Sequence, residues 1–521
     1  MTTIITRELG VTAKGSMLTN EEMDNNLINL NENKLETSIV GSGPNQVPTN
    51  ADLGTLAFQD SDAASLLNPL LKGAVSFEDG TASLPSITNS DDPNTGIYFP
   101  NADTLAIATG GTQRLIIDSN GNVNISGKLA FTQNNLNNYV TWDSSTDTYE
   151  TGYSGETEIH RGMRRCLLLD NGTVNYYLDP NNSNLKADGS DAVLTGADGQ
   201  VMVEIPKFYI KKEKVSNKNY WYISSTPEIG YIVHPAFIKN GVEVNYRYFS
   251  AYDACLYDVS ASQYISGLNL DNATSLIDIN ADILSSVAGV YPIVGLTRAE
   301  FRTLAARRGA GWRQVDFWLV SAIQMLYLLE FRNFNSQQFL GAGNTSGSYL
   351  ASSSNQTDSP HTIAGASNLL GNNSTNIYSG AGVSAKPGTS FMSYRGIENF
   401  FGNCWNWVDG FNILNYVPWV SNNDSYFADD ISTNYIQLSD ALPSTNGYQT
   451  NLKDLNGAFL PSSVGGSSST YITDYFYINS GTRVARFGGS ASDGTDAGAF
   501  CWYCYNGFSS RYRLIGARLA F

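Results

Sequence analysis

The stretch from Phe500 to Tyr505 constrains the fold more than any other part of the chain. Its six residues are all aromatic or cysteine, and polar loops lie on both sides of them. Side chains alternate across a β-strand, so a strand here would have two different faces. One face would carry Phe500, Trp502 and Cys504, and the other would carry Cys501, Tyr503 and Tyr505. One face can then join a core while the other presents aromatic rings to a partner, which favours recognition over catalysis.

Composition favours a β-rich, loop-rich protein. Charged residues make up only 15% of the 521 residues, against about 25% in ordinary globular proteins. Glycine (48) and tyrosine (30) are abundant, and the length predicts three or four structural units at roughly 150 residues each. The net charge of −17 argues against nucleic acid as a partner, because phosphate binding needs clustered Lys and Arg.

The cysteines predict neither a disulfide framework nor a metal site. The chain has five of them, at scattered positions: Cys166, Cys255, Cys404, Cys501 and Cys504. An odd, irregularly spaced set does not describe a disulfide scaffold. Cys501 and Cys504 have the spacing of half a zinc site, but no second pair completes it, and a strand would point them to opposite faces. We expect buried free thiols, no metal and no cofactor.

No segment of the sequence predicts secretion or membrane insertion. Residues 1–7 lack the apolar core of a signal peptide. The longest apolar run, Phe317 to Leu329, contains Ser321 and Gln324 and is shorter than the ~20 residues that a membrane span needs. We therefore expect a chain made in a cytoplasm without a secretion signal of its own.

Residues 1–40 form a short, distinct N-terminal segment. Thr19 and Glu22 have the spacing of a helix capping box. Met23, Leu27 and Leu30 follow at helical spacing, as a brief stripe that is too short to hold an oligomer alone. Residues 41–75 are rich in Gly, Pro and Asn and are interpreted as an irregular linker.

Residues 76–130 predict a small β module. Four short β-type runs occupy 95–100, 104–109, 113–118 and 122–126. Turn sequences, such as Gly110-Gly111 and Asn120-Gly121, separate them as hairpins require. Sheets this small bury little core, so we interpret the module as the shaft of an oligomer, formed by pairing with copies of itself. Residues 131–155 are interpreted as a linker.

From residue 156 to 521 the chain predicts one large domain. It opens with a hairpin of Cys166–Asp170 and Thr173–Leu178, turned by Asn171-Gly172. Two helices are expected further on, and residues 332–480 are expected to be mostly loop with short strands. Trp405, Trp407 and Asn403 are expected to lock the core.

The two expected helices have different signals. Thr297 and Glu300 form a capping box for the first, which should end near Arg308-Gly309. The second should span about Asp316 to Phe331, because its apolar residues recur at helical spacing. Near the end of the loop region, Arg395 and Glu398 are three residues apart and could form an internal ion pair.

Several short segments resemble one known family. Residues from about 200 onward resemble the C-type-lectin fold of phage receptor-binding proteins, including tropism determinants diversified by retroelements. The resembling segments, in order, are Val201–Phe208, His234–Phe237, Ala322–Phe331, Tyr394–Asn399, Gly402–Trp405, Phe487–Gly489 and Ile515–Arg518. In addition, residues 14–26 are similar to the start of many phage tail fibres, and residues 95–124 resemble a segment common in tail fibres of aquatic phages.

The resemblance implies a bacteriophage tail fibre that is mostly β with some α. It implies an elongated, modular homotrimer located in the virion. The N-terminal segment would attach to a tail or baseplate protein, with Leu18, Met23, Leu27 and Leu30 as the attachment residues. The C-terminal lectin-like domain would bind a host cell-surface glycan or outer-membrane protein. No enzyme activity is implied.

The resemblance also implies where the receptor would be contacted. In this family the contacts lie between the Gly-Gly turn and the closing Ile-Gly-Ala-Arg strand. The first loop there offers Ser490, Ser492 and Asp493, the strand offers Tyr503 and Tyr505, and the second loop offers Phe508, Ser510, Arg511 and Tyr512. Tyrosine and arginine suit such a surface, because they give large contact area with a polar tip.

Three other functions remain open at this point. The lectin-like domain could hold other virion proteins, as a structural fibre or collar component. The fold also occurs in formylglycine-generating oxidases, which use a C-terminal cysteine pair, although Cys501 and Cys504 are spaced more closely than that pair. A polysaccharide depolymerase would use paired carboxylates, but the sequence shows no β-helix repeat. The three histidines show no HExxH or triad setting.

Overall fold

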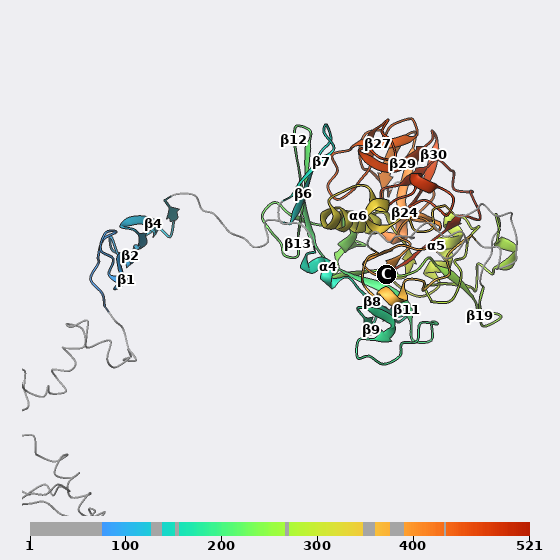
Figure 1. The fold of residues 1–521 in the computed structure, drawn as a ribbon, viewed down its shortest axis with the longest axis horizontal. Coiled ribbons are helices and arrows are strands. Elements are labelled where there is room, and N and C mark those ends of the chain that lie inside the picture. Colours follow the sequence, from blue (N-terminus) through green and yellow to red (C-terminus); the bar gives the residue numbers. More distant parts are fainter. Residues whose placement is uncertain are drawn as a thin grey trace, which may run out of the picture. The chain divides into compact units, whose positions relative to one another are not determined.

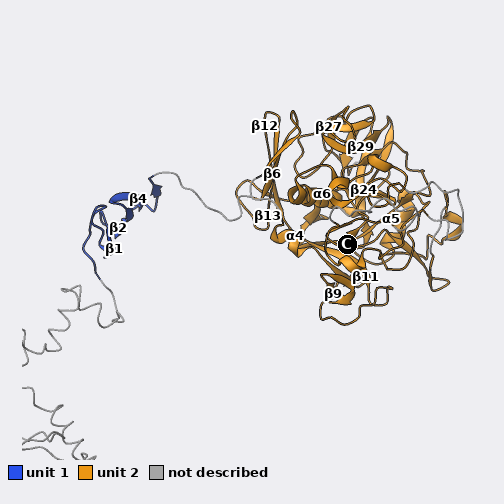
Figure 2. Cartoon of the chain, in the orientation of Figure 1, with its two compact units in different colours: residues 1–131 blue, residues 132–521 orange. Residues whose placement is uncertain are grey.

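The computed structural model describes residues 76–126, 138–151, 156–265, 270–346, 360–375, 390–431 and 434–521. Contacts divide the chain into two units, residues 1–131 and 132–521 (Figure 2). Both are mostly β where the structure describes them. The predicted helix, attachment residues and linker within 1–75 lie outside the described residues. None of the helices described is both long enough and apolar enough to cross a membrane.

The described part of the first unit is a five-stranded antiparallel sheet. Its strands follow in chain order: β1 Ile87–Asn89, β2 Asp92–Tyr98, β3 Leu105–Thr109, β4 Thr112–Ile117 and β5 Val123–Ile125. The four predicted β runs are confirmed. Gly110 and Gly111 turn β3 into β4 with φ of 58° and 71°, a conformation that favours glycine. The buried core is small, comprising Tyr98, Ala106 and Ala108.

The interpretation of 131–155 as a linker is wrong for its middle part. Residues 139–151 form a hairpin, β6 Tyr139–Asp143 and β7 Thr148–Thr151. It extends a sheet of the second unit with β13 Lys218–Ser224, β12 Tyr209–Val215 and β14 Ile232–Val233. Trp142 is fully buried in the main core. The hairpin could not be assigned to this sheet from the sequence, because its partner strand β13 lies more than seventy residues further along the chain.

A seven-stranded sheet lies beside this region. Its strand order is β10 Asn182–Lys186, β9 Val174–Asp179, β8 Arg164–Leu168, β11 Gln200–Pro206, β17 Tyr246–Ser250, β33 Leu519–Ala520 and β21 Arg313–Gln314. The predicted hairpin across Gly172 is β8 and β9, which confirms it. β33 places the last strand of the chain inside the sheet, so the C-terminus is part of the core (Figure 1).

The second unit also contains three small sheets. They are β15 Ile238–Lys239 with β16 Val242–Glu243, β18 Cys255–Asp258 between β19 Gln263–Ile265 and β20 Ile283–Ser285, and β22 Ser393–Tyr394 with β23 Ile397–Glu398.

Four α-helices are described, and both predicted ones are confirmed. They are α4 Glu158–Gly162, α5 Arg298–Ala306, α6 Phe317–Phe331 and α7 Ser336–Leu340. Thr297 and Glu300 form the predicted capping box of α5. α6 is buried on nearly all sides and contacts both β6 and β24 (Figure 1). It therefore forms the central packing element of the main core.

Where the structure describes residues 332–480, they are mostly loop with short strands, as expected, but six of these strands join one large sheet. This sheet has nine strands, and its longest is β24 Trp405–Leu414. Eight strands follow in the order β26 Ile436–Gln437, β25 Val417–Val420, β24, β30 Thr482–Phe487, β31 Trp502–Cys504, β29 Ile472–Ile478, β27 Gly447–Leu452 and β28 Pro461–Val464. The ninth, β32 Ile515–Gly516, also pairs with β24. β24 is buried on both faces. Its apolar residues Trp405, Trp407, Phe411 and Ile413 stand at alternate positions, but Val408 and Asp409 interrupt the pattern, which obscures a strand of this length.

The predicted core residues are buried, but the predicted ion pair is not formed. Trp405, Trp407 and Asn403 are all buried, and the Asn403 amide donates to the Asp253 carboxylate at 2.7 Å. Arg395 pairs with Glu330 and Glu156. Glu398 accepts backbone N–H groups of residues 365 and 367 instead. Its buried carboxylate finds partners that sequence spacing cannot show.

Candidate functional site

The predicted alternation in residues 500–505 is confirmed. Phe500, Trp502 and Cys504 belong to the main core on one side of the nine-stranded sheet. On the other side, Cys501 is buried and Tyr503 is half-buried in a second cluster. Tyr505 follows the strand and is 40% exposed. The tyrosines therefore lie on the face that turns away from the main core.

Strand register aligns large side chains on this face across four strands. Trp407 of β24 is the partner of Arg486 in β30, Arg486 is the partner of Tyr503 in β31, and Tyr503 is the partner of Tyr477 in β29. Directly paired residues share a face of a sheet. Four side chains far apart in sequence thus stand side by side.

The Arg486 guanidinium stacks on the Tyr503 ring. It lies 3.7 Å from the Tyr503 ring centroid, 4.9 Å from that of Trp405 and 5.8 Å from that of Trp407. A cation against aromatic faces is attracted to them. Burial lowers the Arg486 pKa to about 10. The stacked arginine fixes the orientation of Tyr503.

Neighbouring tyrosines extend the face into what we call the tyrosine row: Tyr448, Tyr475, Tyr477, Tyr503 and Tyr505. Successive ring centroids lie 5.0, 4.5, 4.8 and 6.0 Å apart, within the range of favourable aromatic contacts. The row crosses strands β27, β29 and β31 and ends at the exposed Tyr505.

Asp496 accepts hydrogen bonds from two tyrosine hydroxyls of the row. It is the last residue of the 3-10 helix η6 Gly494–Asp496. Its carboxylate accepts from the Tyr448 hydroxyl at 2.5 Å and the Tyr477 hydroxyl at 2.7 Å. Burial and the bond to this carboxylate both raise the pKa of Tyr477. These bonds keep both phenols protonated and fixed in place, so the row is arranged before any ligand arrives.

The first predicted contact loop contains one internal hydrogen-bond network. Ser490 is fully buried, and its hydroxyl and backbone N–H both donate to the Asp493 carboxylate. Burial raises the pKa of Asp493 more than these bonds lower it. Ser492 is exposed at the loop surface. Of the three predicted residues here, Ser492 is the one whose side chain is open to a partner.

The second predicted loop is tied to α5. Arg511 forms a two-pronged ion pair with Glu300, at 2.7 and 3.2 Å. Tyr512 is half-buried against the second cluster, and Ser510 is likewise half-buried. Phe508 is 56% exposed. Phe508 and Tyr505 are the most exposed aromatic rings between residues 490 and 512, and contact of any of these residues with a receptor stays a prediction.

Sequence reasoning missed five residues of this face: Tyr448, Tyr475, Tyr477, Arg486 and Asp496. A signal for two of them was present, because Tyr475 and Tyr477 alternate with Phe476 in an apolar stretch. That alternation is typical of a half-buried strand. The contributions of Tyr448 and Asp496 come from long-range pairing, which the sequence does not reveal.

The cysteines are buried free thiols, as predicted. Burial raises the pKa of the thiols of Cys501 and Cys504, and thiolate is the reactive form. Within the residues that the structure describes, no group of three or more His, Cys, Asp and Glu side chains is arranged to hold a metal ion.

No protein-family model matches the chain, and no curated protein matches it. Two solved structures, the P3c and M1 variants of Major Tropism Determinant, are similar to it with 12% sequence identity. Each match covers 86% of this chain and 98% of the other, with TM-scores of 0.22 and 0.20. Similarity this weak supports no conclusion about fold or activity.

Proposed function

We propose that the chain is a phage tail fibre whose C-terminal unit binds a host cell-surface receptor through the tyrosine row. The row itself is the observation that supports this most strongly. It offers contiguous aromatic rings, two hydroxyls already fixed by Asp496, and the exposed ring of Tyr505 at its end. Phe508, three residues further along the chain, is exposed as well. Rigid aromatic residues give much contact area at little entropic cost, which is why binding surfaces use them.

The remaining parts of the proposal rest on sequence resemblance. Residues 1–40 attach the fibre to a tail or baseplate protein, and three copies assemble along the β module. The small core of residues 76–126 supports association with other copies, because a sheet that buries so little gains from further partners. The fibre acts by binding, without chemistry on its receptor.

Adsorption competition tests the proposal. The full chain is mixed with candidate host cells before phage is added, and cell coating and phage adsorption are measured. We expect the wild-type chain to coat cells and block adsorption. Tyr503→Ala combined with Tyr505→Ala should weaken cell binding at least about tenfold, since tyrosines that act as hot spots of a binding surface contribute over about 1 kcal/mol each.

A matched double variant controls for general effects of losing tyrosines. Tyr246 and Tyr426 are also exposed, at 46% and 43%, and lie outside the row. Changing both to alanine should leave cell binding intact. Equal loss in both double variants would contradict a role for the row. A folded wild-type chain that binds isolated virion proteins but no cells would instead identify a structural collar component.

A further inference from the structure

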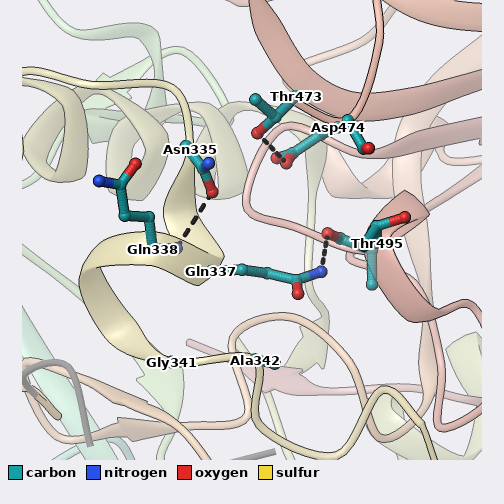
Figure 3. Close-up of a pocket in the computed structure, with 10 residues that line it drawn as sticks. Asn335, Gln337, Gln338, Gly341, Ala342, Thr473, Asp474 and Thr495 are labelled. Atoms are coloured by element: carbon teal, nitrogen blue, oxygen red, sulfur yellow. Dashed lines mark hydrogen bonds between the residues drawn. The ribbon is translucent and has the colours of Figure 1, made fainter. Parts of the chain in front are cut away.

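A polar pocket opens beside the tyrosine row. Its volume is about 470 Å³, within the range of small-molecule sites. Helix α7 and the residues around it supply one side, and the start of β29 and η6 supply the other (Figure 3). The ten lining residues include Gln337 and Gln338 of α7, Thr473 and Asp474 of β29, Thr495 of η6, and Ser468.

The lining chemistry suits an uncharged, hydroxyl-rich ligand. Three amide side chains, three hydroxyls and one carboxyl surround the space, so donors and acceptors are mixed. None of the ten lining residues is Lys, Arg or His, so nothing in the lining would neutralise an acidic ligand. Pockets for apolar ligands are mostly lined by hydrophobic side chains, and this one is not.

Asp474 lies at the inner wall of the pocket. Its carboxyl is buried and accepts the Phe500 backbone N–H at 2.6 Å. Burial raises its pKa to about 8, so near neutral pH it carries a proton that can be donated. A β-carbon on Gly498 would lie 2.1 Å from its Oδ1 atom. The close approach of this glycine fixes the carboxyl against the backbone.

The walls of the pocket are held together before ligand binding. The Gln337 amide donates to the carbonyl groups of Gly494 and Ala497 at 2.8 and 2.7 Å. This joins α7 to η6 across the pocket. A cavity whose walls are already bonded loses little entropy when a ligand enters it.

The pocket and the tyrosine row share residues. The Tyr448 hydroxyl lies 3.2 Å from the hydroxyl of Thr495, which lines the pocket. Thr473, another lining residue, belongs to the same strand as Tyr475 and Tyr477, β29. A ligand that leaves the pocket on this side meets the rings of Tyr448 and Tyr475.

From this arrangement we infer that the receptor is a glycan, of which one uncharged sugar residue occupies the pocket and the next residue stacks on Tyr448 and Tyr475. The inference rests on the proposed receptor-binding function and adds the chemical class of the receptor. Hydroxyl-rich rings satisfy the amides, hydroxyls and carboxyl inside, and the apolar face of a sugar ring fits an aromatic side chain outside.

Two adjacent serines allow a matched test with the full chain. Ser468 lines the pocket and Ser469 does not, and both are exposed. Ser468→Trp would fill the pocket opening, whereas Ser469→Trp adds the same bulk outside it.

Each protein is tested on the bacterial strain that the wild-type chain coats most strongly. Cells are used untreated, after periodate, which cleaves sugar diols, or after proteinase K. Glucose, galactose, mannose and N-acetylglucosamine serve as competitors, with N-acetylneuraminic acid as the charged comparison.

We expect periodate, but not proteinase K, to abolish binding. At least one neutral sugar should compete and N-acetylneuraminic acid should not. Ser468→Trp should weaken binding at least tenfold, and Ser469→Trp should bind like the wild type. Binding that survives periodate but depends on Tyr503 and Tyr505 would overturn the glycan inference and keep receptor binding, with a protein as the receptor. If Ser468→Trp binds cells as well as Ser469→Trp does, the ligand lies outside the pocket. A wild-type chain that coats no strain would overturn both the glycan inference and the proposed receptor binding.

Discussion

At the scale of single residues, burial changes the chemistry of groups that look ordinary in the sequence. Asp474 stands in an apolar stretch of the sequence and Asp188 in a polar one. In the structure, burial raises the Asp474 pKa to about 8, whereas bonds from the Ser190 hydroxyl and backbone lower the pKa of the exposed Asp188. The two carboxyls therefore respond to pH in opposite directions.

Asp474→Asn should change how stability depends on pH. Between the ordinary pKa of 3.8 and the folded pKa of about 8, the unfolded chain has lost this proton and the folded chain keeps it. The folded state binds more protons, so raising the pH destabilises it. From about pH 5 to about pH 7, the wild type should lose about 1.4 kcal/mol per pH unit relative to the Asn variant.

Urea unfolding at several pH values measures this difference. Asp188→Asn is the control, because the exposed Asp188 is ionised in both states above pH 5 and should give no such slope. Parallel stability curves for the wild type and Asp474→Asn would show that Asp474 is ionised in the folded protein.

At the scale of elements, the capping box of α5 also binds a loop that lies far along the chain. Thr297 accepts the Glu300 backbone N–H, and the Glu300 carboxylate accepts from Thr297 in return. The same carboxylate holds Arg511. The helix cap thereby fixes one of the two loops beside the tyrosine row.

Thr297→Ala should destabilise the protein by about 1 kcal/mol, because the first turn of α5 loses a hydrogen-bond acceptor. Thr297→Ser keeps the hydroxyl and should lose much less. The two variants are compared by urea unfolding at constant pH. An alanine variant as stable as the serine variant would mean that the hydroxyl contributes nothing at this position.

Elements with local signals were predictable, and elements defined by distant partners were not. The capping box of α5, the Gly172 hairpin and the alternation around Tyr503 each depend on neighbouring residues and were found. β24 was not found, because Val408 and Asp409 interrupt its alternation and Asp409 is buried against Arg298 and Arg302. Tyr477 contacts Tyr503 through strand pairing, so only the part of the candidate site between residues 490 and 512 could be predicted.

At the scale of the whole molecule, the second unit begins earlier than its sequence suggests. The β6–β7 hairpin pairs with β13, and Trp142 packs edge-on against Phe334, with ring centroids 5.1 Å apart. The Asp147 carboxylate accepts from the Trp142 ring and also from the backbone of Tyr471. The hairpin is therefore bonded to both the core and the nine-stranded sheet region.

A fragment of residues 132–521 should consequently be more stable than one of residues 156–521. The shorter fragment lacks the hairpin, which exposes an edge of β13 and opens the space that Trp142 fills. Removal of a buried tryptophan alone costs about 3–5 kcal/mol, so the shorter fragment should lose at least that much. Trp142→Ala in the longer fragment separates the loss of packing from the loss of strand pairing and should fall between the two in urea unfolding. Equal unfolding midpoints for the two fragments would mean that the hairpin is not part of the folded core, and that the domain begins after residue 155.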